Sequence, residues 1–206
     1  MRDPLDRYYT PPELARACAR ALGMDLGEVA VIDPYAGGGA LLSLGRSPLE
    51  GEILGADLDP EAPAVLDGRA ALADGDTWRP RVLAERRVWL TNPPFTEIRR
   101  RIPGLIERAA AGGALALGVL ARLTLLEGLA FLEHRAPSGV WVGQRRPRWE
   151  GPGGGQASPD TCTVALLVWV WPRLQLAAEG RSSWTQGPPP LHTLTWDRRP
   201  SRRRRG

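Results

Sequence analysis

Residues 29–42, VAVIDPYAGGGALL, carry the pattern that decides the fold of this 206-residue chain. The apolar run from Val29 to Ile32 predicts a short buried strand. The three glycines after Asp33 predict a tight turn into a helix that starts near Ala40. Because glycine adopts positive φ and has no Cβ, such a turn lets the backbone pass close to a ligand. The stretch therefore predicts the first strand–turn–helix unit of an α/β domain.

Strands and helices alternate along the rest of the chain. After a helix that ends near residue 22, we expect strands at 29–32, 52–56, 70–72, 88–90 and 114–120, helices at 98–111 and 125–134, and late strands at 140–142 and 163–171. This alternation predicts a Rossmann-like, doubly wound, mainly parallel sheet, for which we expect seven strands. Because only a loop joins the last two strands, we expect an antiparallel strand at one edge. Residues 1–172 form the expected domain, and the Pro- and Arg-rich residues 173–206 form a tail expected to be partly disordered.

Acidic residues stand where three of these strands end. Asp33, Asp57 and Asp76 follow the first, second and third predicted strands. Ligands of doubly wound sheets bind beyond the carboxyl ends of the strands. Asp57 is placed to accept hydrogen bonds from a ribose diol, and Asp76 can bind an adenine amino group. Taken alone, each acid would more often be a solvated carboxylate, and only together do they favour a ligand that carries both groups.

The sequence Asn92-Pro93-Pro94-Phe95 follows the apolar run at residues 88–90. The two prolines fix φ and donate no backbone hydrogen bond, so they hold Asn92 and the neighbouring carbonyl groups in one pose. An amide oxygen, backbone acceptors and the aromatic face of Phe95 together suit a planar ring with an exocyclic amino group. In isolation, the same four residues would more often form a strand-end turn with a buried Phe.

In this order, the motifs resemble those of class I S-adenosylmethionine-dependent methyltransferases that modify exocyclic amino groups. Residues 33–39 are similar to the cofactor loop of this family, and Tyr8-Tyr9-Thr10-Pro11 is similar to its upstream motif beside the methionine end of the cofactor. Asn92-Pro93-Pro94-Phe95 matches the catalytic motif (Asp/Asn/Ser)-Pro-Pro-(Tyr/Phe/Trp). The order of the motifs resembles the gamma class of DNA adenine-N6 methyltransferases, in a small phage-type form, over about residues 8–172.

The resemblance implies S-adenosylmethionine as the cofactor and a methyltransferase domain at residues 1–172. The implied cofactor-binding residues are Tyr9, Thr10, Pro11, Asp33, Pro34, Ala36, Gly37, Gly39, Asp57, Leu58, Asp76 and Asn92. The implied catalytic residues are Asn92, Pro93, Pro94 and Phe95. The implied contacts to nucleic acid are Phe95, Arg145, Arg146, Arg148 and Trp149. A solvated loop with a partly buried Trp149 is an equally good interpretation of the last four.

The implied reaction flips an adenine out of DNA and methylates its N6 atom. In this reaction the Asn92 side-chain oxygen and the Pro93 carbonyl accept the two amino hydrogens, and Phe95 stacks on the base. The nitrogen then attacks the sulfonium methyl in line. RNA adenine methylation, cytosine N4 methylation, protein-glutamine methylation and a catalytically silent binding module stay open. Because few residues follow the core, we expect relaxed or short sequence specificity, or a partner that supplies recognition. A restriction nuclease that works with the enzyme in restriction–modification is a further possible partner.

Arginine supplies all of the basic side chains. All 27 basic residues are arginine, the net charge is +4, and the pI is near 9.8. Much of the excess lies in Arg198-Arg199 and in residues 202–205. Guanidinium groups pair bidentately with phosphates, so this segment could add affinity for DNA or RNA, or remain a solvated terminus.

Other classes of site have little support in the sequence. There is no uncharged apolar run of the roughly 18 residues that a membrane span needs. The first residues lack the apolar stretch of a signal peptide, so we expect a cytoplasmic protein. Cys18, Cys162, His134 and His192 are isolated from one another, which indicates neither a metal site nor a disulfide framework.

Overall fold

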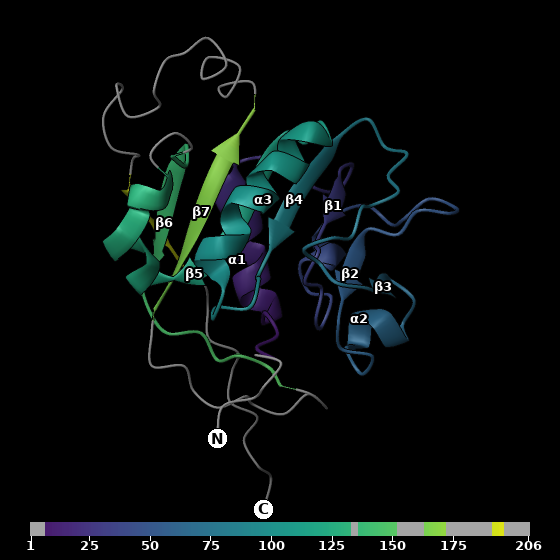
Figure 1. Ribbon diagram of the computed structural model, residues 1–206, viewed down its shortest axis with the longest axis horizontal. Coiled ribbons are helices and arrows are strands. Elements are labelled where there is room, and N and C mark those ends of the chain that lie inside the picture. The colour runs from purple at the N-terminus through teal and green to yellow at the C-terminus, as the bar shows by residue number, and fades with distance from the viewer. Residues whose placement is uncertain (1–6, 133–135, 152–162, 172–190, 196–206) are drawn as a thin grey trace, which may run out of the picture.

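The computed structural model describes residues 7–132, 136–151, 163–171 and 191–195. In chain order its elements are α1 (Pro12–Leu22), β1 (Ala30–Ile32), the 3-10 helix η1 (Leu42–Leu44), β2 (Gly55–Asp57), α2 (Pro63–Leu66), β3 (Ala70–Leu72), β4 (Arg87–Thr91), α3 (Ile98–Ala111), β5 (Ala116–Arg122), the 3-10 helix η2 (Leu123–Leu132), β6 (Gly139–Gly143), β7 (Val164–Val170) and β8 (Leu191–Leu194). In Figure 1, α3 lies in front of the central strands and α1, drawn in purple, lies behind them.

Six strands form one sheet in the order β1-β4-β5-β7-β6-β8. β1, β4 and β5 are mutually parallel, as are β6 and β8, whereas β7 is antiparallel to both of its neighbours. β2 and β3 form a separate parallel pair, joined to the end of β1 by one bridge between Asp33 and Gly55. The α/β class and the mostly parallel sheet are confirmed. The strands are divided six and two, however, and not gathered into the expected single sheet of seven.

The antiparallel strand lies inside the sheet, which corrects the expectation of an antiparallel edge strand. β7 pairs with β5 over seven positions and with β6 over four, so it is bonded on both sides. Residues 164–169 are all buried, and an unbroken apolar run is typical of a strand covered on both faces. The edge position belongs to β8, whose four residues lie within the segment that was expected to form the tail.

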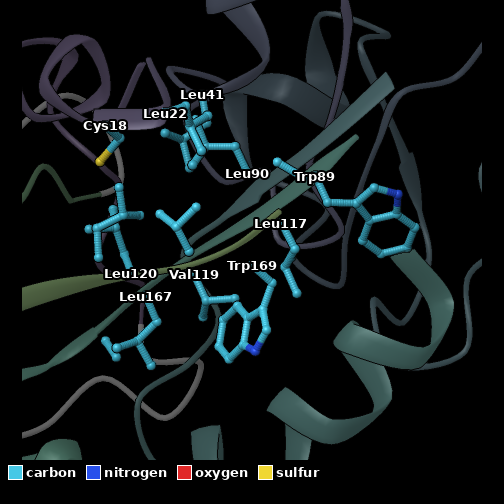
Figure 2. Close-up of a cluster of buried hydrophobic side chains, with 14 of the residues drawn as sticks. Cys18, Leu22, Leu41, Trp89, Leu90, Leu117, Val119, Leu120, Leu167 and Trp169 are labelled. Atoms are coloured by element: carbon cyan, nitrogen blue, oxygen red, sulfur yellow. The ribbon is translucent and has the colours of Figure 1, made fainter. Parts of the chain in front are cut away.

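The sheet face toward α3 carries a row of large side chains. Trp89, Leu117 and Trp169 are cross-strand neighbours on β4, β5 and β7. The guanidinium carbon of Arg108, on α3, lies 5.4 Å from the centre of the Trp89 ring. Figure 2 shows the three side chains of this row extending to the same side of the strands.

The opposite face packs against α1. An added Cβ at Gly118 of β5 would lie 2.7 Å from Leu90 and 3.7 Å from Leu22 of α1. Figure 2 shows Leu22, Leu41 and Leu90 gathered on this side. Glycine at position 118 therefore lets the strand and the helix approach each other closely.

Two helices agree closely with their sequence signals. α1 begins at Pro12, directly after Pro11, and is closed by Gly23 at φ 66°. Proline at the start and glycine just past the end are the expected helix boundaries. α3 spans the predicted residues 98–111 without a shift at either end.

The connections after the strands are shorter than the sequence suggested. The helix expected from Ala40 is only the three-residue η1. It stops because Gly45 packs onto β1, where an added Cβ would lie 2.7 Å from the Val29 carbonyl oxygen. The helix expected at 125–134 is the 3-10 helix η2 instead. The α-helices expected after β1 and β5 are therefore replaced by 3-10 helices, and the doubly wound arrangement of the sheet stays a prediction.

A buried leucine in the central sheet should be worth far more than an exposed one at the edge. Leu120 on β5 is 0% exposed and Leu191 on β8 is 71% exposed. Replacing Leu120 with Ala removes packed atoms and leaves a cavity, so we expect the free energy of unfolding to fall by about 2–5 kcal/mol. Leu191→Ala should change it by about 0.5 kcal/mol or less. Urea unfolding of both variants measures the difference, and equal losses would contradict the described packing.

Candidate active site

A cavity of about 360 Å³ opens beyond the carboxyl ends of β1, β2 and β4. Its walls come from the amino-terminal segment, the loops after these strands and the first turn of α3. The lining residues are Arg7, Tyr8, Tyr9, Thr10, Tyr35, Ala36, Gly37, Asp57, Leu58, Asp59, Gly75, Asn92, Pro94, Thr96, Glu97 and Arg101. The structure thus brings together seven of the twelve residues expected to bind a cofactor. The other five, Pro11, Asp33, Pro34, Gly39 and Asp76, do not line the cavity.

Gly37 and Asp57 form one wall of this cavity. The Gly37 N–H donates to Asp57 Oδ2 at 2.7 Å, and the Asp59 N–H donates to Asp57 Oδ1 at 2.9 Å. Gly37 has φ 47°, and an added Cβ would lie 2.7 Å from the Tyr9 ring. Burial raises the pKa of the Asp57 carboxyl group. The glycine predicted from the sequence is therefore required both for its backbone angle and for the space that Tyr9 occupies.

Tyr9 fixes the amino-terminal wall at three points. Its hydroxyl donates to Asp59 Oδ2 at 3.1 Å. Its N–H donates to the Glu150 carbonyl at 2.8 Å, and the Glu150 N–H donates back to the Tyr9 carbonyl at 3.1 Å. Burial raises the pKa of the Tyr9 hydroxyl, so this group stays a donor. The upstream motif is thereby tied to the loop after β2 on one side and to the segment after β6 on the other.

Asp33 lies beneath the cavity and not in its wall. Its Oδ1 atom accepts a hydrogen bond from Thr91 Oγ1 at 2.6 Å and another from the Tyr35 N–H at 3.0 Å. The residue is 1% exposed, and this burial raises the pKa of its carboxyl group to about 7. Asp33 therefore links the end of β1 to the end of β4, directly below Asn92. Its expected contact with a cofactor stays a prediction.

Asp76 is held by two residues that the sequence patterns did not single out. The Tyr35 hydroxyl donates to Asp76 Oδ1, and Arg101 Nε lies 3.7 Å from Asp76 Oδ2. Arg101 also lies over the Tyr35 ring, 5.2 Å from its centre. Tyr35 and Arg101 line the cavity, together with Gly75, in the place expected for Asp76. Tyr35 could have been identified from the sequence, because it is an aromatic residue inside the predicted cofactor loop, between Asp33-Pro34 and the glycines.

Asn92 presents a buried acceptor without a partner. Its Nδ2 donates to the Tyr8 carbonyl at 2.9 Å. A carbonyl only accepts hydrogen bonds, so this contact requires the NH2 side of the amide to face Tyr8. The opposite atom, Oδ1, is buried and has no hydrogen-bond partner in the described part of the chain. Buried oxygens of this kind are rare, because leaving one unsatisfied costs about 1–3 kcal/mol.

Phe95 is largely enclosed, and its expected stacking on a base stays a prediction. It is 8% exposed. Tyr8 is stacked near it at 6.3 Å between ring centres, and Trp149 meets it edge-on at 5.5 Å. The guanidinium carbon of Arg122 lies 5.1 Å from the ring centre. A stacking partner of Phe95 would therefore have to take the place of one of these groups.

Trp149 is likewise unavailable as a surface platform for a base, contrary to expectation. It is 1% exposed and packs against Tyr8 and Phe95. Of the arginines near it, Arg146 and Arg148 are exposed and Arg145 is half-buried. Trp149 thus packs inside a cluster of three rings with Tyr8 and Phe95. The arginines stay candidates for contact with phosphates.

A second cavity, of about 420 Å³, adjoins the first. Its lining residues are Phe95, Thr96, Glu97, Ile98, Arg99, Arg100, Arg122, Thr124 and Leu125. The two cavities share Thr96 and Glu97 as common wall residues, while Asn92 and Pro94 line the first and Phe95 lines the second. The segment that begins with Asn92 therefore separates two neighbouring spaces, each large enough for part of a small molecule.

Within the described ranges, no group of three or more His, Cys, Asp or Glu side chains could hold a metal ion. No helix there combines the length and the apolar character that crossing a bilayer requires.

Comparison with solved structures shows which proteins share this fold. A predicted RNA methyltransferase from Pyrococcus horikoshii superposes with a TM-score of 0.56 and 21% sequence identity, covering 81% of this chain and 85% of that chain. A type I restriction–modification methyltransferase subunit from Streptococcus thermophilus gives a TM-score of 0.51 at 16% identity, covering 80% of this chain and 45% of that chain. No family model and no curated protein matches the sequence. The chain therefore has the fold of methyltransferases.

The burial of Asp33 should make folding depend on pH. The ordinary pKa of Asp is about 4, and the folded value is raised to about 7. A raised carboxyl pKa means that stability is lost as the pH rises through this window, because the folded chain must hold a buried charge. Asp33→Asn keeps the accepting Oδ1 without the charge. At pH 8 we expect this variant to be more stable than the parent chain by on the order of 1–4 kcal/mol.

Urea unfolding at pH 4.5 and pH 8 tests this expectation. The quantity to compare is the difference in free energy of unfolding between the variant and the parent chain, because the other carboxylates change the stability of both proteins equally. A variant that is less stable by the same amount at both pH values would show that the fold does not raise the pKa of Asp33.

Proposed function

We propose that this protein methylates the exocyclic N6 amino group of adenine in DNA, with S-adenosylmethionine as the methyl donor. The observation that carries the proposal is the unpartnered Oδ1 of Asn92, buried at the wall of the first cavity. An amino group bound beside it would satisfy this acceptor. The hydrogen bond to Tyr8 prevents the amide from turning its NH2 group toward the substrate. An acceptor in that fixed pose selects a donor such as an amine.

The first cavity is proposed to hold the cofactor. Asp57 already accepts two backbone hydrogen bonds, and a carboxylate has lone pairs for more, so it can also accept from ribose hydroxyls. Gly37 leaves the loop free of a side chain there. Asp57, Asp59 and Glu97 line this space, and Arg7 and Arg101 pair with the last two. The lining keeps one more carboxylate than guanidinium, which favours a ligand with a positive sulfonium centre. Seven of the twelve residues that the sequence predicts to bind the cofactor line this cavity.

The flipped base is proposed to occupy the second cavity with its amino group directed past Thr96 and Glu97 toward Asn92 at the wall of the first. Arg122 lies over the Phe95 ring there. If the guanidinium group moves aside, a planar base can stack on the same face of the ring. The two cavities meet at Thr96 and Glu97, so donor and acceptor would approach each other across one short segment. The reaction needs the amine nitrogen to form a bond to the methyl carbon while the carbon–sulfur bond breaks, with one amino proton then lost to water. Alignment of the two reactants supplies much of the rate.

Arginine around the second cavity supports a polyanionic substrate. Arg99 and Arg100 are exposed at its edge, and Arg146 and Arg148 are exposed on the segment after β6. These groups can pair with phosphates without reading sequence. RNA is the second candidate substrate, because the same basic surface fits its backbone and because the similar Pyrococcus protein is a predicted RNA methyltransferase. A restriction nuclease is also proposed as a partner, because the fold is similar to that of a restriction–modification methyltransferase subunit.

Incubation with labelled S-adenosylmethionine and unmethylated genomic DNA, total RNA or a Gly-Gly-Gln peptide separates the alternatives. Label in N6-methyladenine of DNA supports the proposal. Label in N4-methylcytosine, RNA or the peptide assigns the same chemistry to another acceptor. No transfer to any of them, with the cofactor bound, indicates a silent binding module.

Removal of the Asn92 amide should separate chemistry from cofactor binding. Asn92→Ala deletes the proposed acceptor, and loss of one such preorganised contact typically costs about 100-fold or more in kcat. We expect calorimetry to show that the affinity for S-adenosylmethionine is largely kept, because Gly37 and Asp57 are unchanged. Gln144→Ala, at an exposed amide in the loop after β6, is the matched control and should keep full activity. Near-normal turnover by Asn92→Ala would refute the proposed role.

The ring of Phe95 should be needed for the base and not for the cofactor. Phe95→Ala is expected to weaken binding of an adenine-containing oligonucleotide by about 1–3 kcal/mol, the usual worth of base–aromatic stacking. Phe95→Tyr keeps the ring and should bind normally. Because Phe95 also packs against Tyr8 and Trp149, a melting curve is needed to show that the variant is folded. A folded Phe95→Ala with unchanged affinity would rule out stacking.

A further inference from the structure

A third cavity, of about 440 Å³, lies at the other end of β4. It is enclosed by the first residues of β4, the last turns of α3 and the segment around residues 79–82. It shares no lining residue with the two cavities of the proposed active site. Arg87 opens β4 and Asn92 follows its end, so the two residues are about 16 Å apart along the strand. This space is therefore separate from the site described above.

Two buried donors at this cavity have no partner. Trp89 is 1% exposed, and neither its Nε1 nor the Nε of Arg87 has a hydrogen-bond partner among the described residues. Both side chains line the cavity. Figure 2 shows the indole nitrogen of Trp89 pointing away from the labelled hydrophobic side chains. Buried N–H groups are nearly always satisfied in folded proteins, so two of them at one cavity indicate an acceptor that binds there.

The same cavity carries an excess of positive charge. Arg79, Arg87 and Arg108 line it, and Glu107 is the one acid among the lining residues. Arg108 donates to the carbonyls of Gly75 and Trp78, and Arg79 donates to the carbonyls of Thr77 and Trp78. Backbone carbonyls orient these guanidinium groups but do not neutralise their charge. Burial lowers the pKa of Arg108, and the charge of Arg79 lowers it further.

Apolar groups complete the walls. Ile32, Pro80, Val82 and Ala111 line the cavity together with the Trp89 ring. Arg108 already stacks over that ring, 5.4 Å from its centre. A ligand that fits must therefore present an oxyanion to the guanidinium and indole donors and a compact apolar body to the remaining walls. The volume is in the range of ordinary small-molecule sites.

We propose that this third cavity binds a small organic anion, namely a carboxylate or a phosphate monoester on a planar apolar body. The guanidinium groups pair with either oxyanion in a bidentate manner, and Trp89 Nε1 supplies a further, directional donor. Phosphate and carboxylate share the recognition chemistry, so the choice between them is a matter for measurement. The proposal does not rest on methyl transfer, because it concerns binding alone.

Calorimetric titration of the full chain with phenyl phosphate and benzoate tests the proposal, with benzyl alcohol and inorganic phosphate as partial ligands. We expect at least one of the aromatic anions to bind, and both partial ligands to bind at least tenfold more weakly. Phenyl phosphate binding more tightly than benzoate would assign a phosphate monoester, and the reverse order a carboxylate. Heat from none of the probes at millimolar concentration would overturn the proposal.

Two variants locate the binding. Trp89→Phe keeps the ring and removes the N–H donor, and Arg87→Met removes the guanidinium but keeps the apolar stem; each should weaken the anion about tenfold or more. Trp141→Phe, a half-buried tryptophan on β6 that stacks with His192, is the matched control and should have no effect. If Trp89→Phe does not fold, Arg87→Met decides alone. Unchanged affinity in the folded variants, or loss of affinity in Asn92→Ala instead, would place the probe elsewhere and refute this site.

Discussion

The hydrogen bond between Asp33 and Thr91 is the constraint on which the site depends. It joins the ends of β1 and β4 at 2.6 Å, where one strand leads into the glycine loop and the other into Asn92. These strands are directly paired in parallel, about 4.8 Å apart, so the loops that follow them leave the same edge of the sheet. The separation of the two proposed reactants is therefore set by the spacing of a sheet and not by flexible loops. The cost of this arrangement is a carboxyl group whose charge is unfavourable in the fold.

Rigidity continues beyond the strand end. Asn92 is held by its hydrogen bond to the Tyr8 carbonyl, and the two prolines after it remove backbone freedom. Tyr8 in turn packs with Phe95 and Trp149. A fixed acceptor of this kind does not have to reorganise when charge develops on a substrate, which is the property that electrostatic catalysis requires. The site is accordingly built from contacts between segments that are remote in sequence.

The sequence was a good guide where local signals act alone. The bounds of α3 follow from its apolar periodicity, and those of α1 from Pro12 and Gly23. It failed where tertiary packing decides. η1 stays short because Gly45 meets β1, and Trp149 is buried because it fills a space beside two other rings. The motif residues were predicted as a group, yet Tyr35 and Arg101 entered the site through contacts with Asp76 that no linear pattern encodes.

The pairing of Tyr9 with Glu150 has a consequence for how the chain reaches this structure. Two backbone hydrogen bonds join these residues, although four of the six described strands of the main sheet lie between them in sequence. Closing so long a loop is entropically costly and slow compared with local contacts. On a ribosome, the residues around Tyr9 emerge before the segment after β6 and must wait until that segment has been synthesised. An early-made segment thus takes its final position only after much later parts of the chain are available.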